Sequence, residues 1–294
     1  MEAQLYGSLY KLVWSLAHPR QKRTRFNDRI IVLVYLWSVL WDRPVSWACD
    51  PKNWGGRNAF ELPSDSTMSR RLRTVGVQQL IERALAAGSD LFGPPPLVKQ
   101  VDSKPMYVGP YSKDRDAKRG YVAAGQKARG YRLHTLNHGR MVRWFTLAPM
   151  NEHDSTTAPL VLRKLEGGGG YAAADNAYDS NDLHGEAAAV GHQLVAPPRA
   201  CNKGVRDLKH NCPERIRALD LLDSPLEHCG LAGDFGRELY NCRQRVESGY
   251  GGLTLQGLHF LPAWVRGPRR VALWAAGKIL ILLCRDAKNK GLMA

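Results

Sequence analysis

The distribution of apolar residues divides the chain into a helical first part and a second part that contains strands. Residues 29–41 (RIIVLVYLWSVLW) are apolar almost throughout, which predicts a buried helix too short to span a bilayer. Three consecutive prolines at 94–96 cannot continue a helix and predict a stiff linker. Beyond them, short apolar runs predict β-strands within residues 97–103, 131–150, 170–178 and 192–198.

This pattern predicts two domains. The first is a small helical domain in residues 1–93, and the second is a mixed α/β domain in residues 97–294. The interval near 199–236 is basic and rich in loop-forming residues, so we expect an insertion there. Residues 269–288 (RRVALWAAGKILILLCRDAK) predict a helix that closes the second domain.

The charge balance points to a polyanionic partner. The chain has 294 residues, with 42 Lys and Arg against 27 Asp and Glu, a net charge of +15. Nucleic acid is the usual partner of so basic a protein. A membrane surface is the competing partner, but no lysine-rich amphipathic stretch favours it. The first residues lack the features of a signal peptide, so we expect a cytoplasmic, nucleoid-associated protein.

The cysteines suggest neither disulfides nor a metal. Six cysteines are scattered along the chain with no Cys-x-x-Cys pair, which favours reduced thiols. A zinc site can be imagined in one interval, but its spacing matches no standard pattern. The residues of that interval are Cys201, His210, Cys212, His228 and Cys229.

A short arginine-rich helix is predicted in residues 62–76 (LPSDSTMSRRLRTVG). Its apolar side contains Met68, Leu72 and Val75, and its arginines are expected on the other sides. A basic helix after a Pro-Ser turn fits the second helix of a helix-turn-helix laid against DNA. A solvated basic helix is the alternative. Four tryptophans upstream are expected in the core of this domain: Trp37, Trp41, Trp47 and Trp54.

Three acids stand where metal-assisted phosphoryl transfer needs carboxylates. Asp102 ends a strand-like run, and Asp175 follows the small residues of another. Divalent ions in such sites are held by a few carboxylate oxygens that converge from separate elements. Taken singly, Asp102 also fits a turn and Asp175 a helix cap. Asp179 or Ser180 is expected to cap the helix that follows.

The third acid is Glu247, in the segment YNCRQRVESGYGGL. In a continuous helix, Tyr240, Arg243 and Glu247 lie on one narrow stripe. Arg243 and Glu247 are then an i, i+4 pair. The plain alternative is a surface salt bridge of about 0.3–0.5 kcal/mol.

Several ordered motifs together resemble the insertion-sequence type of DDE transposases, a family of RNase H-like enzymes. The resemblance covers most of residues 60–285. Its first motifs are LPSDSTMSRRL for the DNA-binding segment and VDSKP for the strand of the first Asp. The Gly-Tyr-basic-x-His and Asn-x-His-Asp-Ser motifs of the connecting strands follow. AADNAYDSNDL resembles the motif of the second Asp, and YNCRQRVESGYGGL the Tyr-x-x-Arg-x-x-x-Glu signature.

The resemblance implies a fold and a reaction. The fold is a mixed five-stranded sheet flanked by helices, preceded by a small helix-turn-helix-like domain. The reaction is cleavage at transposon ends and attack of the freed 3′-OH on target DNA. Asp102, Asp175 and Glu247 are the implied catalytic residues and ligands of Mg²⁺ or Mn²⁺, with two ions expected. The implied partners are terminal inverted repeats and target DNA, bound by a homodimer.

Other residues of the motifs are expected to contact DNA. Arg132 and His134 alternate with apolar neighbours and so share one strand face, where a satisfied strand pair is the alternative. His153 and Asp154 are interpreted as a helix cap or a supporting hydrogen-bonded pair, and we favour the cap. The full set expected to bind DNA is Arg70, Arg71, Arg73, Arg132, His134, Tyr240 and Arg243.

The sequence departs from the family signature in two places. Thr254 stands seven residues after Glu247, where the family usually has a basic residue that contacts phosphate. Three glycines, Gly249, Gly251 and Gly252, are expected to weaken the helix there. These departures keep open a rival function, a catalytically decayed transposase that now only binds DNA. A nuclease that cuts without joining is a further rival, since one site performs both steps.

Overall fold

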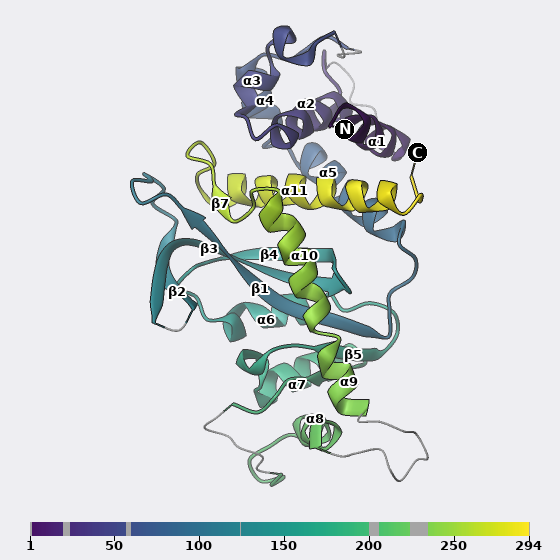
Figure 1. The fold of residues 1–294 in the computed structure, drawn as a ribbon, viewed down its shortest axis with the longest axis vertical. Helices are drawn as coiled ribbons and strands as arrows, with labels where there is room; N and C mark the ends of the chain where they lie inside the picture. The colour runs from purple at the N-terminus through teal and green to yellow at the C-terminus, as the bar shows by residue number, and fades with distance from the viewer. Residues whose placement is uncertain are drawn as a thin grey trace. The chain divides into compact units, whose positions relative to one another are not determined.

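The computed structural model describes residues 2–19, 24–56, 60–123, 125–199, 206–223 and 235–293 (Figure 1). The chain forms two compact units. The first unit comprises Met1–Gly93 together with Leu255–Ala294, and the second comprises Pro94–Thr254. The division at Gly93 coincides with the expected linker. The C-terminal segment, however, groups with the N-terminal helices, whereas the sequence pattern assigned it to the second domain.

The first unit is almost entirely helical. Helix α2 is buried along nearly its whole length, as its apolar sequence predicts. The C-terminal helix α11 packs against α1, α2 and α5, and its apolar residues are the reason that it belongs to this unit. The elements of the first unit are α1 (Glu2–Ser15), α2 (Asp28–Leu40), α3 (Val45–Ala48), η1 (Pro51–Trp54), α4 (Asp65–Arg71), α5 (Val75–Asp90), β7 (Phe260–Leu261) and α11 (Pro268–Asn289).

Two of the four tryptophans form the centre of this core. Trp37 and Trp54 are buried and stacked, with ring centroids 4.8 Å apart. The prediction that all four are core residues is wrong for Trp41, which is 43% exposed because it lies just past the last turn of α2. Trp47, in the short α3, is half-buried.

The arginine-rich helix is α4, and it corrects one expected DNA contact. The Ser64 hydroxyl caps it by accepting a hydrogen bond from the Thr67 N–H at 3.3 Å. Arg71 does not face solvent: it is buried, donates to the Phe26 carbonyl at 2.8 Å and pairs with buried Asp28 at 2.6 Å. Its guanidinium is needed to neutralise that carboxylate. Arg70 and Arg73 are exposed.

The second unit contains a mixed sheet. Strand β3 pairs antiparallel with β1 on one edge and with β2 and β4 on the other, while β1, β5 and β6 run parallel. The order β4-β3-β1-β5-β6 agrees with the expected RNase H-like mixed sheet, and that prediction is confirmed. The strands are β1 (Val98–Val108), β2 (Lys118–Ala123), β3 (Gln126–His138), β4 (Met141–Pro149), β5 (Gly170–Ala173) and β6 (His192–Val195).

Helices cover both faces of this sheet. Val101 and Leu136 pack with residues of α6 and α7 in an apolar core. Asp102 and Lys104 point to the other face, where both contact α10 or the residue just before it. Figure 1 shows α10 crossing over β1. The helices are α6 (Asp154–Leu162), η2 (Asn176–Tyr178), α7 (Asn181–Ala189), α8 (Pro213–Asp223), α9 (Phe235–Asn241) and α10 (Gln244–Leu255).

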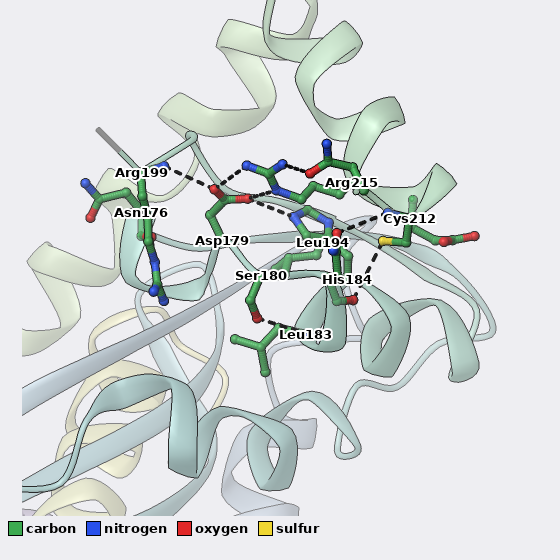
Figure 2. Close-up of polar contacts among 12 residues, drawn as sticks. Asn176, Asp179, Ser180, Leu183, His184, Leu194, Arg199, Cys212 and Arg215 are labelled. Carbon is green, nitrogen blue, oxygen red and sulfur yellow. Dashed lines mark hydrogen bonds and ion pairs between the residues drawn. The ribbon is translucent and has the colours of Figure 1, made fainter. Parts of the chain in front are cut away.

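A buried ion pair anchors α8 beside α7 (Figure 2). Arg215 donates to both carboxylate oxygens of Asp179, at 2.6 and 2.8 Å, and His184 Nε2 lies 3.6 Å from the same carboxylate. All three side chains are almost completely buried. Ser180, one of the two expected caps, caps α7 through the Leu183 N–H. Arg215 is therefore a structural residue, although it lies in the basic interval where an insertion was expected.

Within the described part of the chain, no helix has the length and apolar character needed to cross a membrane. Cys49, Cys212, Cys242 and Cys284 have free thiols. Cys201, His228 and Cys229 lie outside the described residues, as do parts of the expected insertion at 200–205 and 224–234.

Gly249 lets α10 approach the β3–β4 turn. A Cβ built on Gly249 would lie 2.1 Å from the Arg140 carbonyl oxygen, so even alanine does not fit. Gly251, in the same helix, has nothing within 4 Å of its Cβ position. The helix continues to Leu255 through all three glycines. Gly249 is thus explained by close packing.

We expect opposite effects from alanine at these two glycines. Gly249→Ala should lower the free energy of unfolding by about 1–3 kcal/mol, because the methyl group collides with backbone. Gly251→Ala should raise it, by up to about 1 kcal/mol, because alanine favours the helix. Urea unfolding of both variants measures the difference. Equal effects at the two positions would contradict the packing described here.

Candidate active site

Asp102 lies near the middle of β1, on the sheet face that α10 covers. Asp102 is 9% exposed. One carboxylate oxygen accepts a hydrogen bond from the Ser103 N–H at 2.8 Å, and the other lies 3.5 Å from Arg243 Nη1. Thr135 is its direct partner across the β1–β3 pair. Asp102 is therefore a buried acid with a single cation beside it at the edge of hydrogen-bonding distance.

Asp175 follows β5 at the same end of the sheet. Gln100 pairs with Ala173 in the parallel β1–β5 register, so Asp102 and Asp175 each lie two residues beyond a paired position. The Asp175 side chain also accepts a hydrogen bond from the Ala177 N–H at 2.9 Å and caps η2. Both sequence interpretations of Asp175, strand-end acid and helix cap, thus describe its geometry.

Glu247 reaches the site from α10. Arg243 connects it to Asp102, since Arg243 Nη2 lies 3.4 Å from Glu247 Oε1. The Glu247 side chain is 63% exposed, so this contact alone stabilises the fold little. The expected continuous helical stripe is interrupted, because α9 ends at Asn241 and α10 begins at Gln244. Tyr240 nevertheless stays close, with its ring centroid 5.8 Å from the Arg243 guanidinium.

The pKa values of the two aspartates are raised. Burial raises the pKa of Asp102 to about 7; the Ser103 N–H opposes this shift, and the negative charge of Asp175 adds to it. Burial also raises the pKa of Asp175, against the hydrogen bond from Ala177, and the charge of Asp154 adds to the rise. Arg243 lowers the pKa of both aspartates. The site thus concentrates negative charge in a poorly solvated place, which favours cation binding.

The donor set fits a divalent cation in its chemistry. Mg²⁺ prefers carboxylate oxygens, and here Asp102 and Glu247 contact one guanidinium, that of Arg243, whose charge also lowers the pKa of Asp175. No group of three His, Cys, Asp or Glu side chains among the described residues is close enough together to hold a metal ion. Arg243 lies between Asp102 and Glu247. In this arrangement the guanidinium neutralises charge that a metal ion would otherwise neutralise.

A row of side chains that the sequence motifs did not predict as part of the site continues along α10. Tyr250 Oη lies 2.6 Å from Thr135 Oγ1, and Thr254 Oγ1 accepts a hydrogen bond from Lys104 Nζ at 2.6 Å. Lys104 is buried at 8% exposure, and burial lowers its pKa. Its ammonium also lies 5.6 Å from the Tyr250 ring centroid. The i, i+2 spacing of Asp102 and Lys104 on one strand was the available signal.

Arg132 and His134 lie on the opposite face of the sheet, with α6. As expected, they share one strand face: Arg132 pairs with Asp154 at 3.1 Å, and His134 Nδ1 lies 3.9 Å from the same carboxylate. Ser103 donates to Asp154 at 3.1 Å. His134 is completely buried, and burial lowers its pKa to about 4. It is therefore neutral at pH 7 and inaccessible to DNA, which corrects its assignment as a DNA contact.

Asp154 itself was interpreted as part of a helix cap. His153 is the N-cap of α6 and accepts from the Ser155 N–H at 3.3 Å. Asp154 begins the helix and points into the sheet, where its charge raises the pKa of both Asp102 and Asp175. It is a fourth acid in the electrostatics of the site, compensated by Arg132. Asp154 thus pairs with Arg132, whereas the alternative that the sequence left open was a pair with His153, which is the N-cap.

One comparison with known proteins identifies a family. Residues 93–284 match the family model described as "Transposase DDE domain", which is more than half of the chain. No curated protein matches the sequence. Among solved structures, the cryo-EM structure of a piggyBac transposase synaptic complex with hairpin DNA is similar with a TM-score of 0.44 and 10% identity, covering 98% of this chain and 74% of that chain. A score this low carries no argument about function.

Proposed function

Because this chain belongs to the DDE transposase domain family, we propose that it cleaves DNA at transposon ends and joins the freed 3′-OH to target DNA. Asp102, Asp175 and Glu247 are the proposed catalytic acids. One observation carries the proposal: Asp102 of β1 and Glu247 of α10 contact the same guanidinium, that of Arg243, and its charge also lowers the pKa of Asp175, which follows β5. A structural ion pair needs one acid and one base, whereas three acids around one base leave an excess of negative charge.

The chemistry follows from that excess. In-line phosphoryl transfer needs positive charge at the attacking and leaving oxygens, which Mg²⁺ or Mn²⁺ held by the three acids would supply. Arg243 is the group that separates Asp102 from Glu247, and a guanidinium suits bidentate contact with phosphate. We propose that Arg243 turns from the acids to the scissile phosphate when DNA binds, with Tyr240 beside it. Transposition must bring two transposon ends together, so we expect a homodimer on DNA.

Binding of a divalent ion should be visible without any DNA substrate. We expect 10 mM Mn²⁺ to raise the melting temperature of the wild-type protein by a few degrees, because an ion that binds only the folded state with a Kd of about 1 mM stabilises it by about 1.4 kcal/mol. The rise should disappear in Asp102→Asn. Thermal unfolding followed by circular dichroism measures both.

The matched control for this measurement is Asp182→Asn. Asp182 is exposed in the first turn of α7, and the contacts described above for the three acids do not include it. It should keep the full Mn²⁺ response. An equal response in Asp102→Asn would show that the ion binds elsewhere. No response in the wild type, with or without DNA of the element's ends, would favour the decayed DNA-binding protein.

Lys104 offers a cation at the place where this chain lacks the basic residue of the family signature. Thr254 replaces the usual basic residue, and Lys104 Nζ donates to the Thr254 hydroxyl at 2.6 Å. Thr254 is exposed, so the ammonium lies next to the protein surface, and its contacts in the described part of the chain are a hydroxyl and a ring. We propose that Lys104 makes the phosphate contact that the sequence departure put in doubt.

Removing this cation should weaken DNA binding without removing catalysis. We expect Lys104→Met to lower affinity for duplex DNA at 0.1 M salt by about tenfold and the slope of log K against log salt by about 1. Methionine preserves the packing of the lysine stem. Fluorescence anisotropy over a salt series measures both quantities. Thr254→Lys in the Lys104→Met background should restore binding, and failure of that rescue would argue against the shared position.

A further inference from the structure

A pocket of about 680 Å³ in the first unit is lined by residues from both ends of the chain. Its N-terminal side comes from α2, the turn after it, α3, α4 and the residues that follow α4. Its C-terminal side comes from the residues before α11 and the first turns of α11. We call it the arginine pocket, because five arginines line it: Arg43, Arg73, Arg266, Arg269 and Arg270.

These arginines have little negative charge to neutralise them. Asp65 is the one acid among the described residues that line the pocket. In the described part of the chain, the contacts of these guanidinium groups are to uncharged groups: Arg266 donates to the Ala263 carbonyl at 2.6 Å, and Arg269 donates to the Arg73 carbonyl and to the Gln78 amide oxygen. Five guanidinium groups around one cavity repel one another, so the arrangement is favourable when anions enter it.

The interior of the pocket supplies further donors. The Trp274 indole is 3% exposed, and its Nε1 has no hydrogen-bond partner in the described part of the chain. An indole N–H can only donate, so it needs an acceptor. Helix α11 also begins here, with Gly267 as N-cap and Pro268 in its first turn. A helix N-terminus adds a partial positive charge. Arginines, indole and helix end all favour the same kind of ligand, an anion rich in acceptor oxygens.

We propose that the arginine pocket binds phosphate groups of the DNA backbone. This inference rests on the proposed function, which makes DNA the substrate. Five cations exceed what one small anion can neutralise, whereas duplex DNA presents about one negative charge per 1.7 Å of its axis. Arg43, Arg73, Arg266, Arg269 and Arg270 are all exposed, so a polymer can reach them. The DNA-binding surface of the first unit is thus built from the two ends of the chain together.

The DNA-binding surface proposed for the first unit differs from the arginine-rich helix that the sequence predicted. Of the three arginines in the predicted helix, Arg71 is buried against Asp28, and Arg70 lines a different pocket with Arg25 and Glu61. Arg73 alone among them lies in the arginine pocket. The other four arginines come from segments without a DNA-binding motif. They line one pocket because α11 packs on the N-terminal helices.

The test compares two double variants of the full-length protein that lose the same charge. Arg266→Ala with Arg270→Ala removes two pocket cations, and Lys11→Ala with Lys52→Ala removes two exposed cations of the same unit outside the pocket. Binding to a fluorescein-labelled duplex is followed by anisotropy between 0.05 and 0.2 M KCl. We expect the pocket variant to bind at least about tenfold more weakly at 0.1 M salt and to lose about 2 from the salt slope.

The control variant should bind within about threefold of wild type with an unchanged slope. Arg43→Ala, from the other end of the chain, should lose about 1 from the slope. Equal affinities and slopes for the two double variants would overturn the arginine pocket and leave the proposed function standing. A wild-type protein that binds no duplex at any salt would overturn the proposed function and this inference with it. Unchanged melting temperatures establish that the variants fold.

Discussion

Asp102→Asn is expected to abolish DNA strand cleavage and joining, lowering the rate by at least about a thousandfold, or about 4 kcal/mol in the activation barrier. Asparagine keeps the size of the side chain and removes the charge that would hold a divalent ion. The measurement is a cleavage and strand-transfer assay with labelled DNA of the element's two ends. Product that is nicked and never joined, from the wild-type protein, would favour the nuclease. Full activity of Asp102→Asn would refute the assignment.

The same substitution should not destabilise the protein. The folded-state pKa of Asp102 is about 7, against an ordinary value near 3.9, so the folded state holds this proton more tightly than the unfolded state. The stability contributed by Asp102 is therefore full below about pH 4 and is lost as the pH rises through 7. At pH 8 and without metal, Asp102→Asn should melt at or above the wild-type temperature. A large loss of stability would assign Asp102 to the fold.

Asp179→Asn is expected to have the opposite profile, a loss of about 3–5 kcal/mol in unfolding free energy. Arg215 is 3% exposed in its side chain and donates twice to Asp179 (Figure 2). Removing the carboxylate charge leaves that guanidinium buried without its counter-ion. Urea unfolding at pH 7 measures the loss. The control is Asp220→Asn, which breaks an exposed pair with Arg206 and should cost less than about 1 kcal/mol.

The pH dependence of stability distinguishes these two acids further. Burial alone raises the pKa of Asp179, but the nearby His184 imidazole and the hydrogen bonds from Arg215 outweigh it and hold that pKa well below its usual range. A lowered folded-state pKa gives stability that is present above about pH 4 and is lost as the pH falls below it. Wild-type protein should therefore lose stability between pH 5 and pH 2 more steeply than Asp179→Asn. Parallel curves for the two proteins would contradict this role.

The contrast between Asp102 and Asp179 shows why sequence alone identified the site only partly. Both are buried aspartates. Asp179 has a full buried partner in Arg215, from α8, while Asp102 shares Arg243 with two other acids. Whether a buried acid is compensated depends on residues that are distant in sequence. Motif order was needed to choose Asp102, Asp175 and Glu247 as candidates.

The assignments of the basic residues depended on tertiary structure in the same way. Arg71, His134 and Arg215 are of residue types that often contact DNA, yet each is buried against an acid of another element. Conversely, the sequence motifs did not predict Lys104 as a DNA contact, and its ammonium lies beside Thr254. A basic residue is equally basic in either environment, and only its neighbours decide whether its charge remains available to a ligand.

The sequence by itself determined the local elements of this protein. Period and apolar content predicted the buried α2, the strands that carry or precede Asp102 and Asp175, and the division near the prolines, because these features depend on neighbouring residues. Tertiary structure decided which unit α11 joins, which sheet face each polar side chain occupies and which cations are neutralised. Those outcomes depend on the packing of residues far apart in the chain, as where Arg43 and Arg270 line the same arginine pocket.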